Sequence, residues 1–262
     1  MKEDRFDSLL RRELKKETGH IGVSDFLKTR IDMEITARQE ESTMKKRMHF
    51  KRYIAAAACI CLLIPAGIFA GGKAVSSYVS STGAADYAAS TQWSDLDKME
   101  KKVGIKTDAV KNFSNGYHYK EIDTSSFNAL DADGNKMFKV KELGVIYENA
   151  AGHELNCSMH AADDRMRDDQ TADFTAEYDG ITVEYFQNTY KFVPADYQET
   201  EEDKAMEAAG DYFISYGNDK VEVRESSSVQ WEKDGISYMI QGFDIDISPQ
   251  DMLSMAGKMI QG

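Results

Sequence analysis

Acidic side chains are the groups in this chain whose spacing comes nearest to a known chemical site. Residues 131–135 read Asp-Ala-Asp-Gly-Asn, and Glu142 stands at the twelfth place counted from Asp131. In a calcium-binding EF-hand loop the invariant glycine is at the sixth place and a glutamate is at the twelfth. Gly134 is two places too early, so we predict a hairpin turn here and no calcium site.

Histidine and cysteine form no metal-binding or catalytic set. No Cys-x-x-Cys pair is present, and the histidines are scattered along the chain, at His20, His49, His118, His153 and His160. Cys157 is the one thiol after residue 72, and we expect it to be a small buried apolar side chain. No Ser-His-Asp set or glycine-rich phosphate loop is found. We therefore expect no enzyme, no cofactor and no metal.

One uncharged run divides the chain into two parts of opposite charge. Residues 53–72 reach the roughly 20 mostly apolar residues that a bilayer-spanning helix needs. Residues 1–52 carry a balance of +4 and five basic residues directly before the run, whereas residues 73–262 carry −17. The run begins too late for a cleaved signal peptide. Basic flanks stay in the cytoplasm, so we predict a single-pass protein of the cell membrane with the N-terminus cytoplasmic and the C-terminal domain extracytoplasmic.

Two short amphipathic helices are predicted in the cytoplasmic part. In residues 3–17 the apolar side chains recur at three- and four-residue spacing, and Ser24 is a typical N-cap for a second helix. The two helices have too few apolar residues for a core of their own. We expect them to bind a partner protein or to lie on the inner membrane surface. The candidate partner-binding residues are Phe6, Leu9, Leu10, Leu14, Phe26, Leu27, Ile31 and Ile35.

The long C-terminal part alternates between apolar and polar residues in several runs, which predicts strands. The clearest hairpin joins 221–232 to 236–240 through Asp234-Gly235. Ser248 and Pro249 open a final helix with one apolar side, and a short helix is predicted at 95–102. The acidic runs at 163–173 and 199–203 are expected on the surface.

The expected fold class is α+β. It combines short cytoplasmic helices, one transmembrane helix and an extracytoplasmic antiparallel sheet of roughly six to eight strands with flanking N- and C-terminal helices. The negative charge of the outer part argues against nucleic acid as a partner. The predicted divisions are 1–52 (cytoplasmic helices), 53–72 (transmembrane helix), 73–92 (flexible linker) and 93–262 (outer domain).

This layout resembles that of bacterial membrane-anchored anti-sigma-factor-like proteins. The segments 6–10, Phe-Asp-Ser-Leu-Leu, and 23–28, Val-Ser-Asp-Phe-Leu-Lys, are similar to the cytoplasmic start of that group. The runs 231–238 and 248–256 resemble an uncharacterised outer-domain family found in such proteins. Zinc-binding members carry a His…Cys-x-x-Cys set, and this chain has only His20 in that region, so the resemblance is to the zinc-free type.

The resemblance implies a signalling role. Residues 1–45 would bind a sigma factor, the outer domain would sense an envelope signal, and a regulatory protease would cleave near the linker or span. The alternative is a membrane-anchored module that binds a lipid, a peptide or a wall fragment and has no transcriptional partner.

Overall fold

The computed structural model describes residues 75, 77–83, 85–131, 133–166, 170–209 and 212–262. The predicted cytoplasmic helices and the predicted span 53–72 lie outside these residues, as do the eight candidate partner-binding side chains (Phe6, Leu9, Leu10, Leu14, Phe26, Leu27, Ile31 and Ile35). No helix within the described part of the chain is long and apolar enough to cross a membrane.

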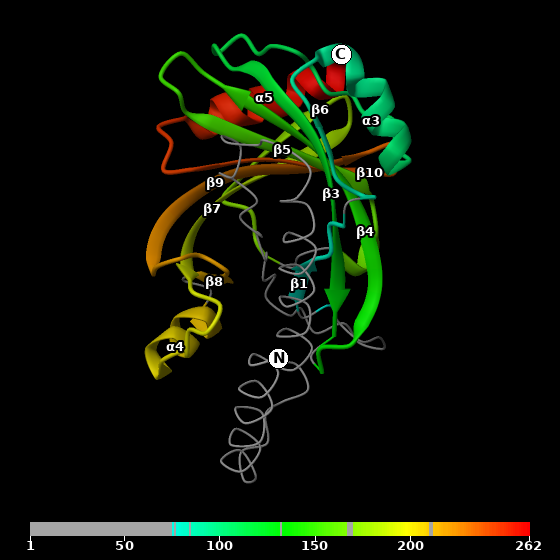
Figure 1. The fold of residues 1–262 in the computed structure, drawn as a ribbon. Helices are drawn as coiled ribbons and strands as arrows, with labels where there is room; N and C mark the ends of the chain where they lie inside the picture. Colours follow the sequence, from blue (N-terminus) through cyan, green and yellow to red (C-terminus); the bar gives the residue numbers. More distant parts are fainter. Residues whose placement is uncertain (1–74, 76, 84, 132, 167–169, 210–211) are drawn as a thin grey trace. The chain divides into compact units, whose positions relative to one another are not determined.

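The described residues form one large, almost entirely antiparallel sheet with few helices, an α+β arrangement (Figure 1). The strand order is β1-β3-β4-β5-β10-β9-β7-β6, with β2 also paired to β3 and β8 paired in parallel to β7. The strands are β1 (Ser77–Ser80), β2 (Ala88–Ser90), β3 (His118–Leu130), β4 (Lys136–Glu148), β5 (Glu154–Ala161), β6 (Phe174–Tyr178), β7 (Ile181–Val193), β8 (Phe213–Tyr216), β9 (Glu222–Lys233) and β10 (Ile236–Phe243).

The described residues include three α-helices, α3 (Leu96–Val103), α4 (Glu201–Ala209) and α5 (Pro249–Gln261), and two short 3-10 turns, η1 (Trp93–Asp95) and η2 (Asp164–Met166). Helix α5 begins as predicted. The side chain of Ser248 accepts a hydrogen bond from the backbone N–H of Asp251, and Pro249 follows at the first helical position. The predicted helix at 95–102 matches α3, which ends at Gly104 in the left-handed conformation.

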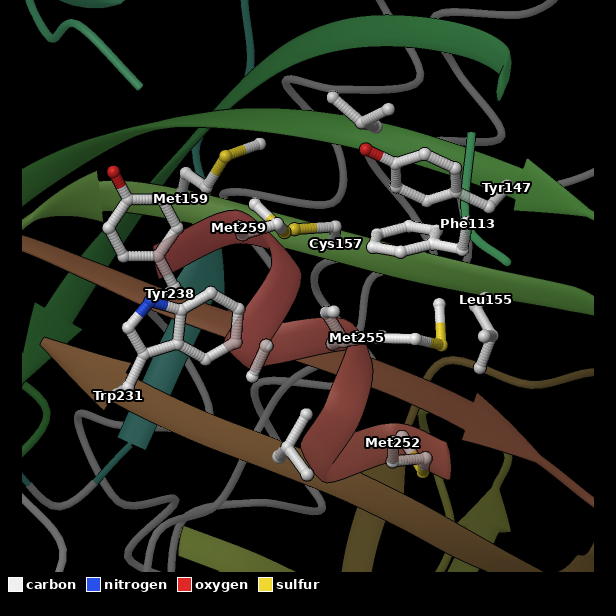
Figure 2. Close-up of a cluster of buried hydrophobic side chains, with 14 of the residues drawn as sticks. Phe113, Tyr147, Leu155, Cys157, Met159, Trp231, Tyr238, Met252, Met255 and Met259 are labelled. Carbon is white, nitrogen blue, oxygen red and sulfur yellow. The ribbon is translucent and has the colours of Figure 1, made fainter. Parts of the chain in front are cut away.

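One face of the sheet, which we call the first face, carries the main core. Cross-strand neighbours Ile122, Val145, Cys157, Ile240 and Val229 lie in a row on it and are buried. Helix α5 packs its apolar side against this row, and its methionines lie among the sheet side chains (Figure 2). The predicted apolar side of the helix is confirmed, because all its members are buried: Met252, Leu253, Met255, Ala256, Met259 and Ile260.

Two further predictions about this core are confirmed. Trp231 is buried, with its ring stacked on that of Tyr238 at a centroid distance of 5.0 Å (Figure 2). Cys157 is a buried free thiol, and burial raises its pKa far above the usual range, so it stays protonated. The turn of the last hairpin has positive φ at both Asp234 and Gly235, the conformation that an Asp-Gly turn favours.

The structure differs from the sequence-based expectation in three places. Residues 77–80 and 88–90, expected in a linker, form β1 and β2 on the edge of β3. The sheet has ten described strands, more than expected, because short polar edge strands such as β6 have no clear alternation. The acidic run 199–203 is not wholly on the surface, because it leads into α4 and buries Asp203.

Candidate functional site

The face of the sheet opposite α5, which we call the second face, is covered by none of the described helices. Helix α5 contacts β6, β7 and β9 through the main core, and Met99 places α3 in the same core. Helix α4 packs through Met206 on Val193, near the end of β7. Successive side chains of a strand point to opposite faces, and Val193 follows Phe192 of the second face, so Val193 lies on the first face. The three helices therefore share the first face, and Figure 1 shows α3 and α5 together on one side of the sheet.

Two carboxyl groups lie on the second face, on the neighbouring strands β3 and β4, and we call Asp123 and Glu142 the acid pair. Asp123 is on β3 opposite Gly144, and Glu142 is on β4 opposite Ser125. Antiparallel pairing makes the two acids diagonal neighbours on one face. The Ser125 hydroxyl lies 3.2 Å from a carboxylate oxygen of Glu142, to which it donates. Both acids are only partly exposed.

Gly144 allows the acid pair to form. A Cβ at this position would lie 2.3 Å from Oδ1 of Asp123, closer than any side chain tolerates. The carboxyl group of Asp123 therefore rests over the bare backbone of β4. A residue with a side chain at 144 would push Asp123 toward solvent and away from Glu142.

Burial raises the pKa of both acids toward neutrality. The pKa of Glu142 is raised to about 7, chiefly by burial and then by the negative charge of Asp123, and hydrogen bonds from Ser125 and Ser158 offset part of this. The pKa of Asp123 is raised to about 6 by burial and by the nearby Glu121. No cation of the described residues is among the groups that set either value. The pair therefore changes charge between about pH 5 and 8.

Asp203, a buried carboxylate elsewhere in the described part of the chain, is surrounded by hydrogen-bond donors and has a structural role. Asp203 accepts hydrogen bonds from the Tyr197 hydroxyl (2.7 Å) and the Thr200 backbone N–H (2.8 Å), and it is also bonded to Lys191 and Tyr212. Burial raises the pKa of Asp203, but these donors outweigh it, so the net pKa is well below the usual range. This contrast sets the acid pair apart, because among the described residues no cation is a cause of either pKa shift and only serine hydroxyls donate to Glu142.

Small polar side chains continue from the acid pair across the second face. Ser158 lies next to Gly144 in the sheet, and Gln241 and Ser228 face each other on β10 and β9. The Gln241 amide donates to the Ser226 hydroxyl at 2.8 Å. All four residues are buried, although none is apolar. We call Ser158, Ser226, Ser228 and Gln241 the polar strip.

Aromatic groups flank the polar strip on both sides. On the β7 side, the Tyr190 ring centroid lies 5.4 Å from those of Phe213 and Phe243, and Phe192 joins this group. Tyr190 and Phe213 are buried, whereas Phe192 and Phe243 are partly exposed. On the β3 side, the partly exposed Phe127 lies between Tyr78 and His160, at centroid distances of 5.3 and 6.2 Å. The second face therefore has a polar middle and aromatic margins.

In the sequence, Glu142 stands out only by its place relative to a calcium loop, and Asp123 does not stand out as a site residue. The predicted hairpin is confirmed, because β3 and β4 follow each other in the chain and pair antiparallel. The available signal was the alternation of Glu121 and Asp123 around Ile122. It was hidden because the following Thr-Ser-Ser run is polar on both faces.

Comparison of the chain with protein-family models, curated proteins and solved structures finds no match.

Proposed function

We propose that this chain is a single-pass membrane protein whose outer domain binds a polar envelope ligand on the second face. The observation that carries the proposal is the placement of all three described helices on the first face, with the acid pair and polar strip on the other. Ligand sites commonly combine apolar and aromatic surroundings with a few polar groups that fix orientation.

The chemistry of the second face favours a peptide or a wall fragment over a lipid. The partly exposed Ser125 hydroxyl and the carboxyl groups of the acid pair can hydrogen-bond to the hydroxyls and amides of such ligands. Above about pH 7 the acid pair is anionic and suits an amino group. A lipid chain would leave these polar groups without partners, which is unfavourable in a dry contact.

A binding measurement tests this function. The full chain in detergent is titrated calorimetrically with soluble fragments of digested cell wall, with short basic peptides, and with a fatty acid. We expect the first or second probe to bind and Glu142→Gln to weaken that binding at pH 8 by about tenfold, the effect of losing one charged hydrogen bond. Glu202→Gln, an exposed position on α4, is the matched control. Binding of the fatty acid alone would contradict the proposal.

A second function, sequestration of a sigma factor, is supported by the apolar stripes of residues 1–35. Each stripe needs an apolar surface to cover it, and a partner protein can provide one. Leu10→Asp and Ile31→Asp should each abolish co-purification of a sigma factor from cells, because an unpaired charge in an interface costs several kcal/mol. Ser8→Asp adds the same charge to the polar side of the first predicted helix and should leave binding intact. Absence of any sigma factor from the wild-type pull-down would refute this role.

A further inference from the structure

The segment expected to be a linker runs along the outer edge of β3. Residues 77–83 and 85–90, which we call the strap, contribute β1 and β2. Strand β1 pairs with 127–130 and β2 pairs with 122–124, so both lie on the same long strand. Within the described part of the chain, β3 is the sole strand partner of both.

The segment that connects β1 to β2 makes polar contacts with β3 and β4, and these hold the strap on β3. The Ser81 backbone N–H donates to the Ser126 carbonyl at 2.8 Å. The carboxylate of Asp86 accepts from Lys139 at 2.6 Å and from the Ser126 hydroxyl at 3.2 Å. The charge-assisted bond from Lys139 lowers the pKa of Asp86, so this contact persists down to acidic pH.

The apolar contacts of β1 belong to a small cluster that is separate from the main core. Val75, Tyr78 and Ala129 form its buried part, with Phe127 and Phe138 packed against it. No member of this cluster contributes to the core beneath α5. Loss of β1 from the edge would therefore leave the main core intact, and β2 adds to that core only the partly buried side chain of Ala88.

We propose that the strap is a releasable element, which opens from β3 without unfolding of the main core and then exposes its backbone to proteases. Short edge strands with few core contacts are the parts of a fold that open most readily. The strap contains no proline, so its extended backbone fits a protease once it is released. Tyr78 of the strap contacts Phe127, which lies at the margin of the second face. A ligand bound on that face would therefore lie close to a contact that breaks when the strap opens.

The role of this opening in regulated cleavage beside a membrane rests on the proposed function, whereas the opening itself does not. Hydrogen exchange of the purified full chain in detergent needs neither a ligand nor a membrane orientation. We expect amides of 77–80 to exchange at least a hundredfold faster than those of β5 and β10. We also expect them to exchange at least tenfold slower than those of a free peptide of the same sequence. Core-like exchange, or exchange as fast as in the peptide, would overturn the proposal.

Proteolysis of variants gives a second, independent test. Chymotrypsin can cleave the strap after Tyr78 or Tyr87, and cleavage of a transiently open segment follows its open population. Asp86→Ala removes the central anchor and should increase the cleavage rate about tenfold. The control, Lys120→Ala, removes an ion pair with Glu148 and Glu154 on the opposite edge of β3 and should leave the rate unchanged.

A disulfide across β1 and β3 keeps the proposal testable if Asp86→Ala fails to fold. Val79 and Asn128 are directly opposite each other in the register, so the double variant Val79→Cys/Asn128→Cys can form a cross-strand bridge. The oxidised form should resist cleavage at both tyrosines, and reduction should restore the wild-type rate. Equal cleavage of the oxidised and reduced forms would show that the strap is cut without leaving β3, contrary to the proposal.

Discussion

At the scale of single residues, the acid pair shows how a sheet places two carboxyl groups where neither has its usual pKa. Asp123 and Glu142 are 19 positions apart in sequence, and antiparallel pairing of β3 with β4 brings them to one face. Gly144 supplies the space, and burial supplies the pKa shift. The same environment makes their ionised forms unfavourable, which gives a measurable dependence of stability on pH.

Stability should fall as pH rises from about 4.5 to 7.5 through the effect of the acid pair. The folded protein retains these protons to about pH 6 and 7, whereas the unfolded chain loses them near 4, so ionisation favours unfolding. Glu142→Gln should be about 1–3 kcal/mol more stable than wild type at pH 8 and nearly equal to it at pH 5, from the size of the shift. Urea denaturation at the two pH values measures this. If the variant and the wild type differ in stability by the same amount at pH 5 and at pH 8, Glu142 has an ordinary pKa.

At the scale of elements, α5 determines the stability of the domain, because it supplies six buried apolar side chains to one core. The helix lies so close to β6 that Gly257 has no room for a side chain. A Cβ at this position would be 2.6–2.8 Å from ring atoms of Tyr178. The ring is rigid and packed against the core, so it cannot move aside as the end of a flexible chain would.

Gly257→Ala should lower the stability of the domain despite the better helix propensity of alanine. Propensity favours alanine by about 1 kcal/mol, whereas overpacking of a close contact typically costs 1–3 kcal/mol. We expect a net loss and a lower thermal midpoint, measured by circular dichroism. Ser254→Ala, at an exposed position of the same helix, should be neutral or slightly stabilising. A midpoint for Gly257→Ala above that of wild type would mean that α5 can shift away from β6.

At the scale of the whole molecule, the strap joins the sheet to the sequence that precedes it. Strand β1 begins at Ser77, five residues after the end of the predicted span at residue 72. An anchored domain with so short a connection would stay close to the membrane surface. Opening of the strap would lengthen that connection and present its backbone to proteases on the outer side.

The predicted topology is tested by labelling single cysteines in intact cells. Ser77 is buried in β1, so Ala85, which is exposed, is the better outer position. With Cys59 and Cys61 replaced by alanine, Ala85→Cys should react with a membrane-impermeant thiol reagent in intact cells, and Ser42→Cys should react only after permeabilisation. The parent without an added cysteine is the control, since Cys157 is buried and protonated. The reverse labelling pattern would invert the proposed orientation.

Several features of the described sheet and its helices followed from the sequence alone, because local patterns determine them. The Asp-Gly turn between β9 and β10 needs positive φ at both residues, and the cap of α5 needs only Ser248 and Pro249. The apolar side of α5 and the burial of Cys157 and Trp231 followed from hydrophobicity and period.

Only the tertiary structure decided which polar side chains lie next to each other on the second face. It also decided that the small residues of the strap form strands of the sheet. Strand order joins β3 to β4 and β5 and so assembles the acid pair beside Ser158, a result of register that no local pattern encodes. The Ser- and Ala-rich strap is indistinguishable from a linker by composition. It becomes part of the sheet because β3 is long enough to leave its outer edge free for two short strands.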